Sequence, residues 1–168
     1  MRKFYCLLIL SCLSLPVQAL ETWITFQDEN AVFTVEVPVA PVVNHYATKM
    51  DDGSEIATDT YSVERGEVAM MVMVGDLSGI KKDSTAIIED TVAGAAEDKI
   101  IISKSNDELD GHKGLSAIFD DADGNRYMDR VFLVNGKLYQ LLTVIFKNAA
   151  PEKRAEIDRF SHSLHFNK

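Results

Sequence analysis

Cysteine is nearly absent from this sequence of 168 residues, and both of its occurrences, Cys6 and Cys12, lie close to the N-terminus. The rest of the chain therefore cannot form a disulfide, use a thiol nucleophile or hold a metal ion through thiolate ligands. Such a chain must be held together by its hydrophobic core. At this length about 70% of the surface of the unfolded chain can be buried, so a core of sufficient size is feasible.

Long apolar runs are also scarce. The apolar segment at residues 4–15 is too short to cross a membrane as a helix, because a membrane-spanning helix needs about 20 residues. Arg2 and Lys3 place positive charge before this segment, and Val17-Gln18-Ala19 follows it with the small residues of a cleavage site. This layout is typical of a secretory signal peptide.

We therefore expect residues 1–19 to be a signal peptide and residues 20–168 to form a single exported domain, with the periplasm as its compartment. No stable membrane span is expected after cleavage. Two alternatives are an uncleaved N-terminal anchor and a lipoprotein attached through Cys12. The lipoprotein is disfavoured because bulky Leu10 stands where a lipid-attachment motif prefers a small residue.

Basic residues are in the minority, with 17 Lys and Arg against 26 Asp and Glu. Because cleavage removes Arg2 and Lys3 and leaves all 26 acidic residues, the formal net charge changes from -9 to -11. A negatively charged surface argues against nucleic acid and against anionic lipid headgroups as partners. Solubility is the simplest explanation of the charge.

Catalytic motifs are missing as well. The sequence has no Gly-x-Ser-x-Gly elbow, no phosphate-binding glycine loop, no dinucleotide fingerprint and no His-Glu-x-x-His. His112 follows Asp110-Gly111 and is a candidate general base for a hydrolase, but no paired nucleophile accompanies it. We therefore expect a protein that is not an enzyme and that carries no cofactor.

An acidic loop at residues 120–125 is a candidate calcium site. If its glycine takes the sixth position of an EF-hand loop, Asp121 and Asp123 take the third and fifth. The first and twelfth positions are then Phe119 and Arg130, which cannot serve as ligands there. A hairpin turn with solvated carboxylates is the preferred interpretation.

Two histidines near the C-terminus are a candidate zinc pair. His162 and His165 are three residues apart at the end of an expected helix, and Asp158 lies one turn before His162. No third ligand follows from the spacing. The alternative is that the histidines favour the C-terminal end of the helix dipole. Metal binding, of calcium or zinc, is therefore the second hypothesis for function.

Met70, Met71 and Met73 suggest copper, because thioethers bind Cu(I). Successive residues of a strand point to opposite faces, so only Met71 and Met73 would share a side. Methionine also fills gaps in hydrophobic cores, and this is the preferred interpretation.

The strongest positive signal is Asn135-Gly136 between two apolar runs. Both residues tolerate positive φ, so the pair predicts a two-residue type I′ turn. The turn sets a register that pairs Val134 with Lys137, Phe132 with Tyr139, and Arg130 with Leu141. Both faces of the hairpin are apolar, which indicates two central strands covered on both sides.

The remaining pattern predicts an α+β fold, in which an antiparallel meander carries helices packed on its faces. The continuous apolar run at residues 67–74 indicates a strand buried on both faces. A turn is expected at residues 106–111. Further strands are expected at residues 23–26, 31–37, 42–50, 55–64, 99–103 and 115–119, and helices from Asp83 or Ser84 to residue 97 and at residues 151–164.

Four short motifs carry a resemblance to a known family: Trp23-x-x-Phe26, Phe33-x-Val35-x-Val37-Pro38, Gly136-x-Leu138-Tyr139 and Phe160-x-x-Ser163-Leu164-x-Phe166. With this order of elements the chain resembles the PsbP-like/Mog family, and among its members the bacterial exported DcrB type. The resemblance implies an α/β/α sandwich and a non-enzymatic assembly, regulatory or binding role. We accordingly expect an exported binding or assembly factor whose partner is a protein of the cell envelope.

Overall fold

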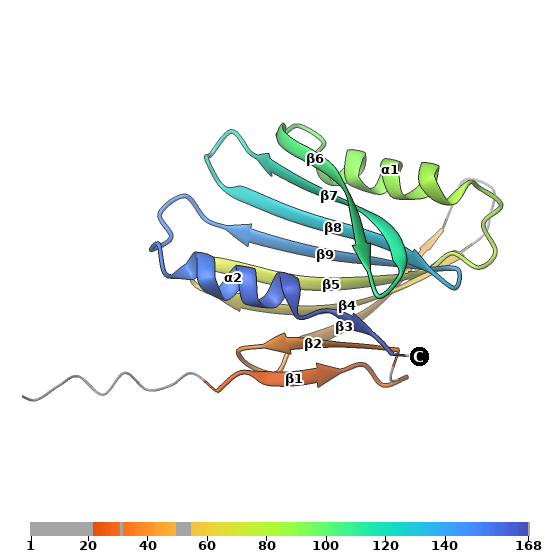
Figure 1. Cartoon of the computed structure of the whole chain (residues 1–168), viewed down its shortest axis with the longest axis horizontal. Coiled ribbons are helices and arrows are strands. Elements are labelled where there is room, and N and C mark those ends of the chain that lie inside the picture. Colours follow the sequence, from red (N-terminus) through yellow and green to blue (C-terminus); the bar gives the residue numbers. More distant parts are fainter. Residues whose placement is uncertain (1–21, 31, 50–54, 168) are drawn as a thin grey trace, which may run out of the picture.

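The computed structural model describes residues 22–30, 32–49 and 55–167 of the chain and contains two antiparallel sheets and two helices (Figure 1). The proposed signal peptide, with Cys6 and Cys12, lies outside the described residues. The larger sheet has the strand order β3-β4-β5-β9-β8-β7-β6, and the smaller has the order β1-β2-β10. Within the described ranges, no helix has both the length and the apolar composition needed to span a membrane.

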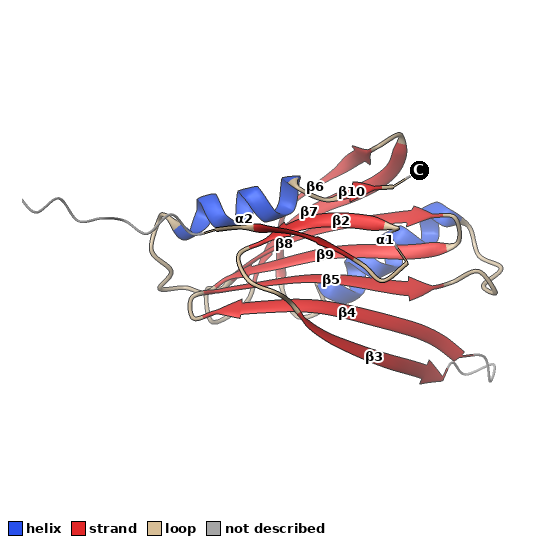
Figure 2. Cartoon of the chain, turned by 90° about the horizontal axis from the view of Figure 1, so that it is seen from below, coloured by secondary structure: helices blue, strands red, loops and turns tan. Residues whose placement is uncertain are grey.

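The strands of the larger sheet are β3 (Val42–Lys49), β4 (Glu55–Arg65), β5 (Val68–Asp76), β6 (Ile100–Leu109), β7 (His112–Asp120), β8 (Arg126–Val134) and β9 (Lys137–Ile145). Those of the smaller sheet are β1 (Ile24–Gln27), β2 (Phe33–Val37) and β10 (His165–Phe166). The helices are α1 (Ser84–Ala95) and α2 (Lys153–His162). Seen from below, α2 and β2 lie in front of the larger sheet and α1 lies behind it (Figure 2).

The hairpin of β8 and β9 has the turn and the register that the sequence predicts. Asn135 has φ 53° and Gly136 has φ 78°, as a type I′ turn requires. All three predicted pairs are present: Val134 with Lys137, Phe132 with Tyr139, and Arg130 with Leu141. Because β9 also pairs with β5 and β8 also pairs with β7, both strands lie in the middle of the sheet.

One face of this hairpin contributes to a core shared with α2 and the smaller sheet. Phe132 and Tyr139 are almost completely buried there, together with Ile157 and Phe160 of α2. Phe166 of β10 completes the core. Its ring centre lies 4.8 Å from that of Tyr139. Residues from both ends of the described chain therefore close over this face of the sheet.

The opposite face of the larger sheet is covered in part by α1. The Asp83 side chain accepts the Ala86 N–H and caps the helix, as expected from the sequence. Ile88 and Val92 of α1 then pack against β7 and β8. The buried strand residues on this face are Leu115, Ala117, Phe119 and Val131.

Strand β5 differs from the prediction that it is buried on both faces. Val68, Met70 and Val72 are buried, but Met71 and Met73 on the α1 side are only half-buried. The reason is the position of α1, which packs against β7 and β8. An apolar run in a central strand thus does not require a second layer over every strand.

The predicted turn at residues 106–111 is also wrong. Strand β6 continues to Leu109, which pairs with His112 across a two-residue turn. In this turn Asp110 has φ 51° and Gly111 has φ 83°, so it repeats the backbone of the Asn135-Gly136 turn. The polar sequence of residues 103–108 hid the strand, because side chains exposed on both faces do not alternate between apolar and polar.

Candidate functional site

Strand β6 forms one edge of the larger sheet (Figure 1). It pairs with β7 on one side, and no other described strand pairs with it on the other side. Such an edge presents backbone N–H and C=O groups that can bind another strand. Its first three residues are apolar and exposed: Ile100 is 69% exposed, Ile101 50% and Ile102 53%. An exposed apolar edge strand is a typical site for the addition of an extended segment.

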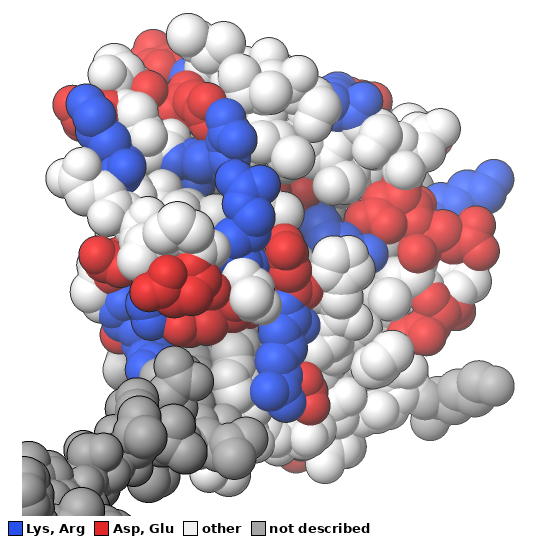
Figure 3. Space-filling view, turned by 60° about the vertical axis from the view of Figure 1, so that its left-hand side comes forward, with Lys and Arg blue, Asp and Glu red and all other residues white. Residues whose placement is uncertain are grey.

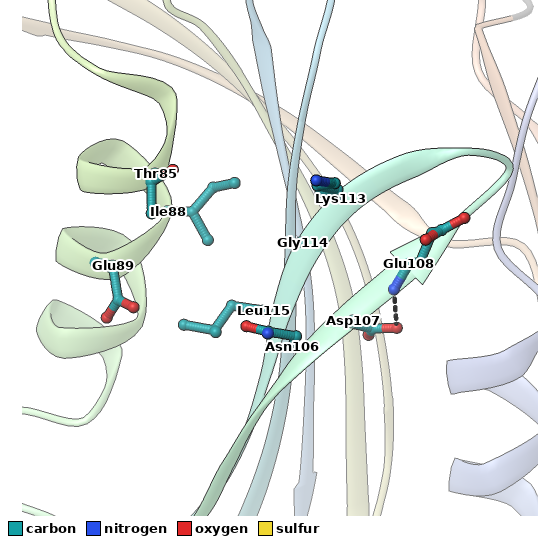
Figure 4. Close-up of a pocket in the computed structure, with 9 residues that line it drawn as sticks. All are labelled: Thr85, Ile88, Glu89, Asn106, Asp107, Glu108, Lys113, Gly114 and Leu115. Atoms are coloured by element: carbon teal, nitrogen blue, oxygen red, sulfur yellow. Dashed lines mark hydrogen bonds between the residues drawn. The ribbon is translucent and has the colours of Figure 1, made fainter.

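A groove between α1 and the β6–β7 hairpin opens on one face of this edge and is called the α1 groove below (Figure 4). It has a volume of about 480 Å³. Ile88 and Leu115 point into the space between helix and strand and give it an apolar floor. Glu89, Asn106 and Lys113 contribute polar groups around it. The groove can therefore take an apolar side chain with polar groups at its edge.

A second hollow, called the Arg130 groove below, opens on the other face of β6 and has a volume of about 340 Å³. Its lining is mostly polar and joins β6 to α2. Arg130 donates hydrogen bonds to both carboxylate oxygens of Asp107, from Nε at 2.6 Å and from Nη2 at 3.0 Å. It also donates from Nη1 to the Ser161 carbonyl at the end of α2. The wall formed by β6 is thus fixed to the helix by one guanidinium group.

Both grooves lie along the same strand, and Asn106 and Asp107 line both of them. Asn106 pairs with Leu115 and lies on the α1 side, as does Glu108, which pairs with Lys113. Ser105 and Asp107 lie on the opposite side and line the Arg130 groove. A strand added alongside β6 would point its own side chains alternately toward the two grooves. Backbone hydrogen bonds would give such a complex affinity, and the grooves would give it specificity.

The other edge of the sheet, β3, also has exposed apolar side chains. Val42 and Tyr46 are more than half exposed there. No residue of β3 lines the α1 groove or the Arg130 groove. The β6 edge thus combines a free edge with a groove on each face.

The carboxylates of the acidic loop are used within the loop itself. Asp121 Oδ1 accepts the backbone N–H groups of Asp123 and Asn125 at 3.0 and 2.9 Å. Its Oδ2 accepts the Asn125 side-chain amide at 2.9 Å and the Tyr127 hydroxyl at 3.0 Å. The hydrogen bond from the Asn125 side chain is the main reason that the pKa of Asp121 is lowered. Asp123 takes part in this network through its backbone N–H.

His162 and His165 do not lie on one helix, contrary to the prediction. Helix α2 ends at His162, and His165 belongs to β10, where it pairs with Thr34. His162 Nδ1 lies 2.7 Å from the carbonyl oxygen of Asp158, and His165 Nδ1 lies 3.6 Å from Asp110 Oδ2. Both rings line a third hollow of about 480 Å³. Nowhere in residues 22–30, 32–49 and 55–167 do three or more His, Cys, Asp or Glu side chains form a group that could hold a metal ion.

His112 is the first residue of β7. Its ring packs edge-on against Phe166, with ring centres 5.6 Å apart and an interplanar angle of 89°. It lines none of the four hollows described here. Met71 and Met73 share one face of β5, and Met70 lies in the core on the other face, as strand alternation predicts.

Sequence comparison identifies no relative of this chain: no protein-family model and no curated protein matches it. Structure comparison does find similar folds. The solution structure of cyanobacterial PsbP (CyanoP) from Synechocystis sp. PCC 6803 aligns with a TM-score of 0.55 over 92% of this chain and 98% of that one, at 12% identity. The chain has a PsbP-like fold. A crystal structure of PA94 from Pseudomonas aeruginosa, a protein of unknown function described as a putative regulator, aligns at a TM-score of 0.43 with 8% identity over 81% of this chain and 91% of that one.

The β6 edge of this PsbP-like structure is the feature that sequence reasoning missed. Two local signals for it were present. Three consecutive isoleucines precede a polar run, and Asp110-Gly111 ends that run with the residues of a type I′ turn. Together they define a strand with an exposed apolar start. Its position at the edge depends on the order of the strands, which no local pattern contains.

Proposed function

We propose that this protein is an exported, non-enzymatic binding or assembly factor of the cell envelope, and that it binds an extended segment of an envelope protein along β6. The observation that carries the proposal is the β6 edge itself. It combines an unpaired side, three exposed isoleucines and a groove on each face. Strand addition uses all three features at once.

The PsbP-like fold and the sequence pattern support this role. One helix lies on each side of the larger sheet, an arrangement compatible with the α/β/α sandwich of the PsbP-like/Mog family. The four sequence motifs resemble the PsbP-like/Mog family, and we propose the exported DcrB type as the member of that family that this chain is most similar to. The signal-peptide pattern at residues 1–19 supports export to the periplasm.

The two grooves define the chemistry of the partner segment. Side chains that enter the α1 groove meet the aliphatic floor of Ile88 and Leu115, and should be apolar. Side chains that enter the Arg130 groove meet serine, aspartate and arginine groups beside Met128, so a polar side chain would find hydrogen-bonding partners there. The partner is therefore an extended segment with apolar and polar residues at alternate positions. It would add further apolar contacts to Ile100, Ile101 and Ile102.

A second copy of this chain fits the edge less well. In an antiparallel pair of two β6 strands centred on the middle of the strand, Ile101 would face Glu108 of the other copy and Ile102 would face Asp107. Apolar side chains would thus lie opposite carboxylates. Cross-strand pairs of this kind do not stabilise a sheet, so the edge favours a different partner.

Photo-crosslinking in cells tests the proposal directly. A photoreactive residue at position 106, between the two grooves, should form a discrete adduct with an envelope protein. The same residue at Tyr46, on the other edge, should not. The double substitution Ile101→Lys with Ile102→Lys should abolish the adduct, because lysines on an edge strand oppose strand addition.

Val42→Lys with Val43→Lys is the matched control, since it places the same charges on the exposed side chains of β3. It should leave the adduct from position 106 unchanged. Thermal melting of each variant verifies that it is folded. Absence of any adduct from position 106, or an adduct that persists in the β6 lysine variant, would show that β6 is not the binding edge.

A further inference from the structure

A small basic hollow lies at the end of the larger sheet where β8 begins and β9 ends. Three of its lining residues are cations, Arg126, Lys147 and Arg154, and its volume is about 240 Å³. Figure 3 shows this end of the molecule, where Lys and Arg side chains run across the middle of the surface. The hollow lies on a chain with a net charge of -9, so a cluster of cations here is contrary to the overall composition.

The cations are only partly neutralised by protein groups. Asp120 accepts hydrogen bonds from Arg126 Nε at 2.9 Å and Nη2 at 2.8 Å. This hydrogen-bonded pair raises the pKa of Arg126 and lowers that of Asp120. Neither Lys147 nor Arg154 forms an ion pair with any residue of the described chain. Three positive charges therefore surround the hollow against one carboxylate.

The acidic loop helps to hold the hollow in shape. Asp121 Oδ2 accepts the Asn125 side-chain amide, and Asn125 Oδ1 in turn accepts the backbone N–H of Lys147 at 3.1 Å. The lysine stem also lies against Gly124, where a Cβ atom would be 3.4 Å from Lys147 Cδ. The two turns that carry the basic side chains are thus joined by hydrogen bonds. Such preorganisation lowers the entropic cost of binding an anion.

We propose that this basic hollow binds the phosphate group of an amphipathic ligand. A phosphate offers three strong acceptor oxygens and up to two negative charges, which suits guanidinium and ammonium donors from several directions. The apolar part of the ligand would lie against Ile145 and Phe146 at the rim, where Phe146 is 41% exposed. The nearest carboxylates, Asp120 and Asp121, already accept hydrogen bonds from Arg126 and from Asn125 and Tyr127. Carboxylates more than about 8 Å away are screened at physiological salt.

This proposal concerns residues other than those of the β6 edge. It can therefore be tested independently of the proposed function. Its first test is a titration of the whole folded domain with inorganic phosphate, followed by amide chemical shifts, against chloride at equal ionic strength. Amides of residues 124–126 and 146–155 should shift and saturate with phosphate only. Lys147→Ala and Arg154→Ala should each weaken the affinity by about tenfold, the effect of losing one charge-assisted hydrogen bond.

Lys81→Ala is the matched control. Lys81 is exposed and follows the Leu77–Ile80 turn, which is hydrogen-bonded to Gly136 at the other end of the sheet. Lys81→Ala removes one positive charge, as Lys147→Ala and Arg154→Ala each do. It should leave the affinity for phosphate unchanged. Equal weakening by all three variants would mean that only net charge matters, and would overturn the proposal.

Vesicles identify the source of the phosphate. Co-sedimentation with phosphatidylglycerol vesicles, but not with phosphatidylcholine vesicles, and its loss in the Lys147→Ala variant would identify a lipid headgroup. Saturable binding of inorganic phosphate without vesicle binding would identify a free phosphate ester. Saturable binding of neither probe would show that the hollow is not a phosphate site.

Discussion

The ring of Phe132 lies directly against Gly114 across the ladder of β7 and β8. A Cβ atom on Gly114 would lie only 2.4 Å from Phe132 Cδ1 and from the carbonyl oxygen of Val131. Backbone and core ring both occupy the space that a side chain would need. The same glycine lines the α1 groove, so one close contact links the central core to the candidate site.

Gly114→Ala should destabilise the protein by about 1–3 kcal/mol, because the added methyl group forces Phe132 or the strand to move. The measurement is urea-induced unfolding of the wild type and the variant. Gly94→Ala is the control. No atom lies within 4 Å of a Cβ at Gly94 in α1, so that variant should gain up to about 1 kcal/mol from helix propensity. Equal stabilities for the two variants would refute the packing argument.

Asp129 should make the stability fall as the pH rises. Its carboxyl group is fully buried, and this burial raises its pKa from 3.8 to about 7 against the opposing hydrogen bond from Gln140. In the unfolded chain the group loses its proton near pH 4, but in the folded chain only near pH 7. The contribution of the Asp129 carboxyl to the free energy of unfolding is therefore fully present below pH 4. It is lost as the pH rises from 4 to 7.

Asp129→Asn should remove this dependence. Between pH 5 and pH 8 the wild type should lose about 2.7 kcal/mol relative to the variant, because its stability falls by about 1.4 kcal/mol per pH unit from pH 5 to pH 7. Urea unfolding at the two pH values measures the change. Asp123→Asn, at an exposed position, is the control and should follow the wild type. A parallel pH response of Asp129→Asn and wild type would contradict the prediction.

Gly136→Ala should weaken the central hairpin. Gly136 has φ 78°, and a Cβ there would meet Ser78 Cα at 3.2 Å. We expect a loss of about 1–2 kcal/mol, since a left-handed backbone is unfavourable for an alanine. Asn135→Gly, at the neighbouring position of positive φ, should be close to neutral in the same unfolding assay. A large loss in Asn135→Gly would show that the side chain of Asn135, and not the backbone, matters.

Arg130→Lys should loosen the contact between β6 and α2. Lysine keeps the charge but loses the two hydrogen bonds to Asp107 and the bond to the Ser161 carbonyl. It also changes the cation–π contact with Phe132, whose ring centre lies 5.3 Å from Arg130 Cζ. We expect a loss of about 1–3 kcal/mol. Amide exchange should become faster at residues 105–109. Arg126→Lys, on the more exposed pair with Asp120, should lose less.

The sequence predicts the central hairpin well because local chemistry determines it. Asn135-Gly136 suits only a few turns, and the alternation of Phe132 and Val134 leaves one register for the strands. The cap at Asp83 and the stripe of Ile88 and Val92 are local in the same way. These signals need only neighbouring residues, and the structure confirms each of them.

The candidate site is harder to predict because it depends on tertiary arrangement. No local pattern in residues 100–109 indicates that β6 is the last strand of the sheet. Its exposed residues also do not alternate between apolar and polar. The end of α2 is similar. Ser163 accepts the Glu36 N–H and donates to the Phe160 carbonyl, which turns His165 away into β10. Spacing alone suggested that His162 and His165 share a helix, and this long-range contact separates them.

The pairing of β10 with β2 has a consequence for the time at which the domain can form. Phe166 and Phe33 stand opposite each other, and both belong to the same core as Tyr139. The core on this face cannot close until β10, which follows every other described element in the chain, has paired with β2. Closure of this face is thus coupled to a contact between strands from opposite ends of the described chain, and such long-range contacts slow folding.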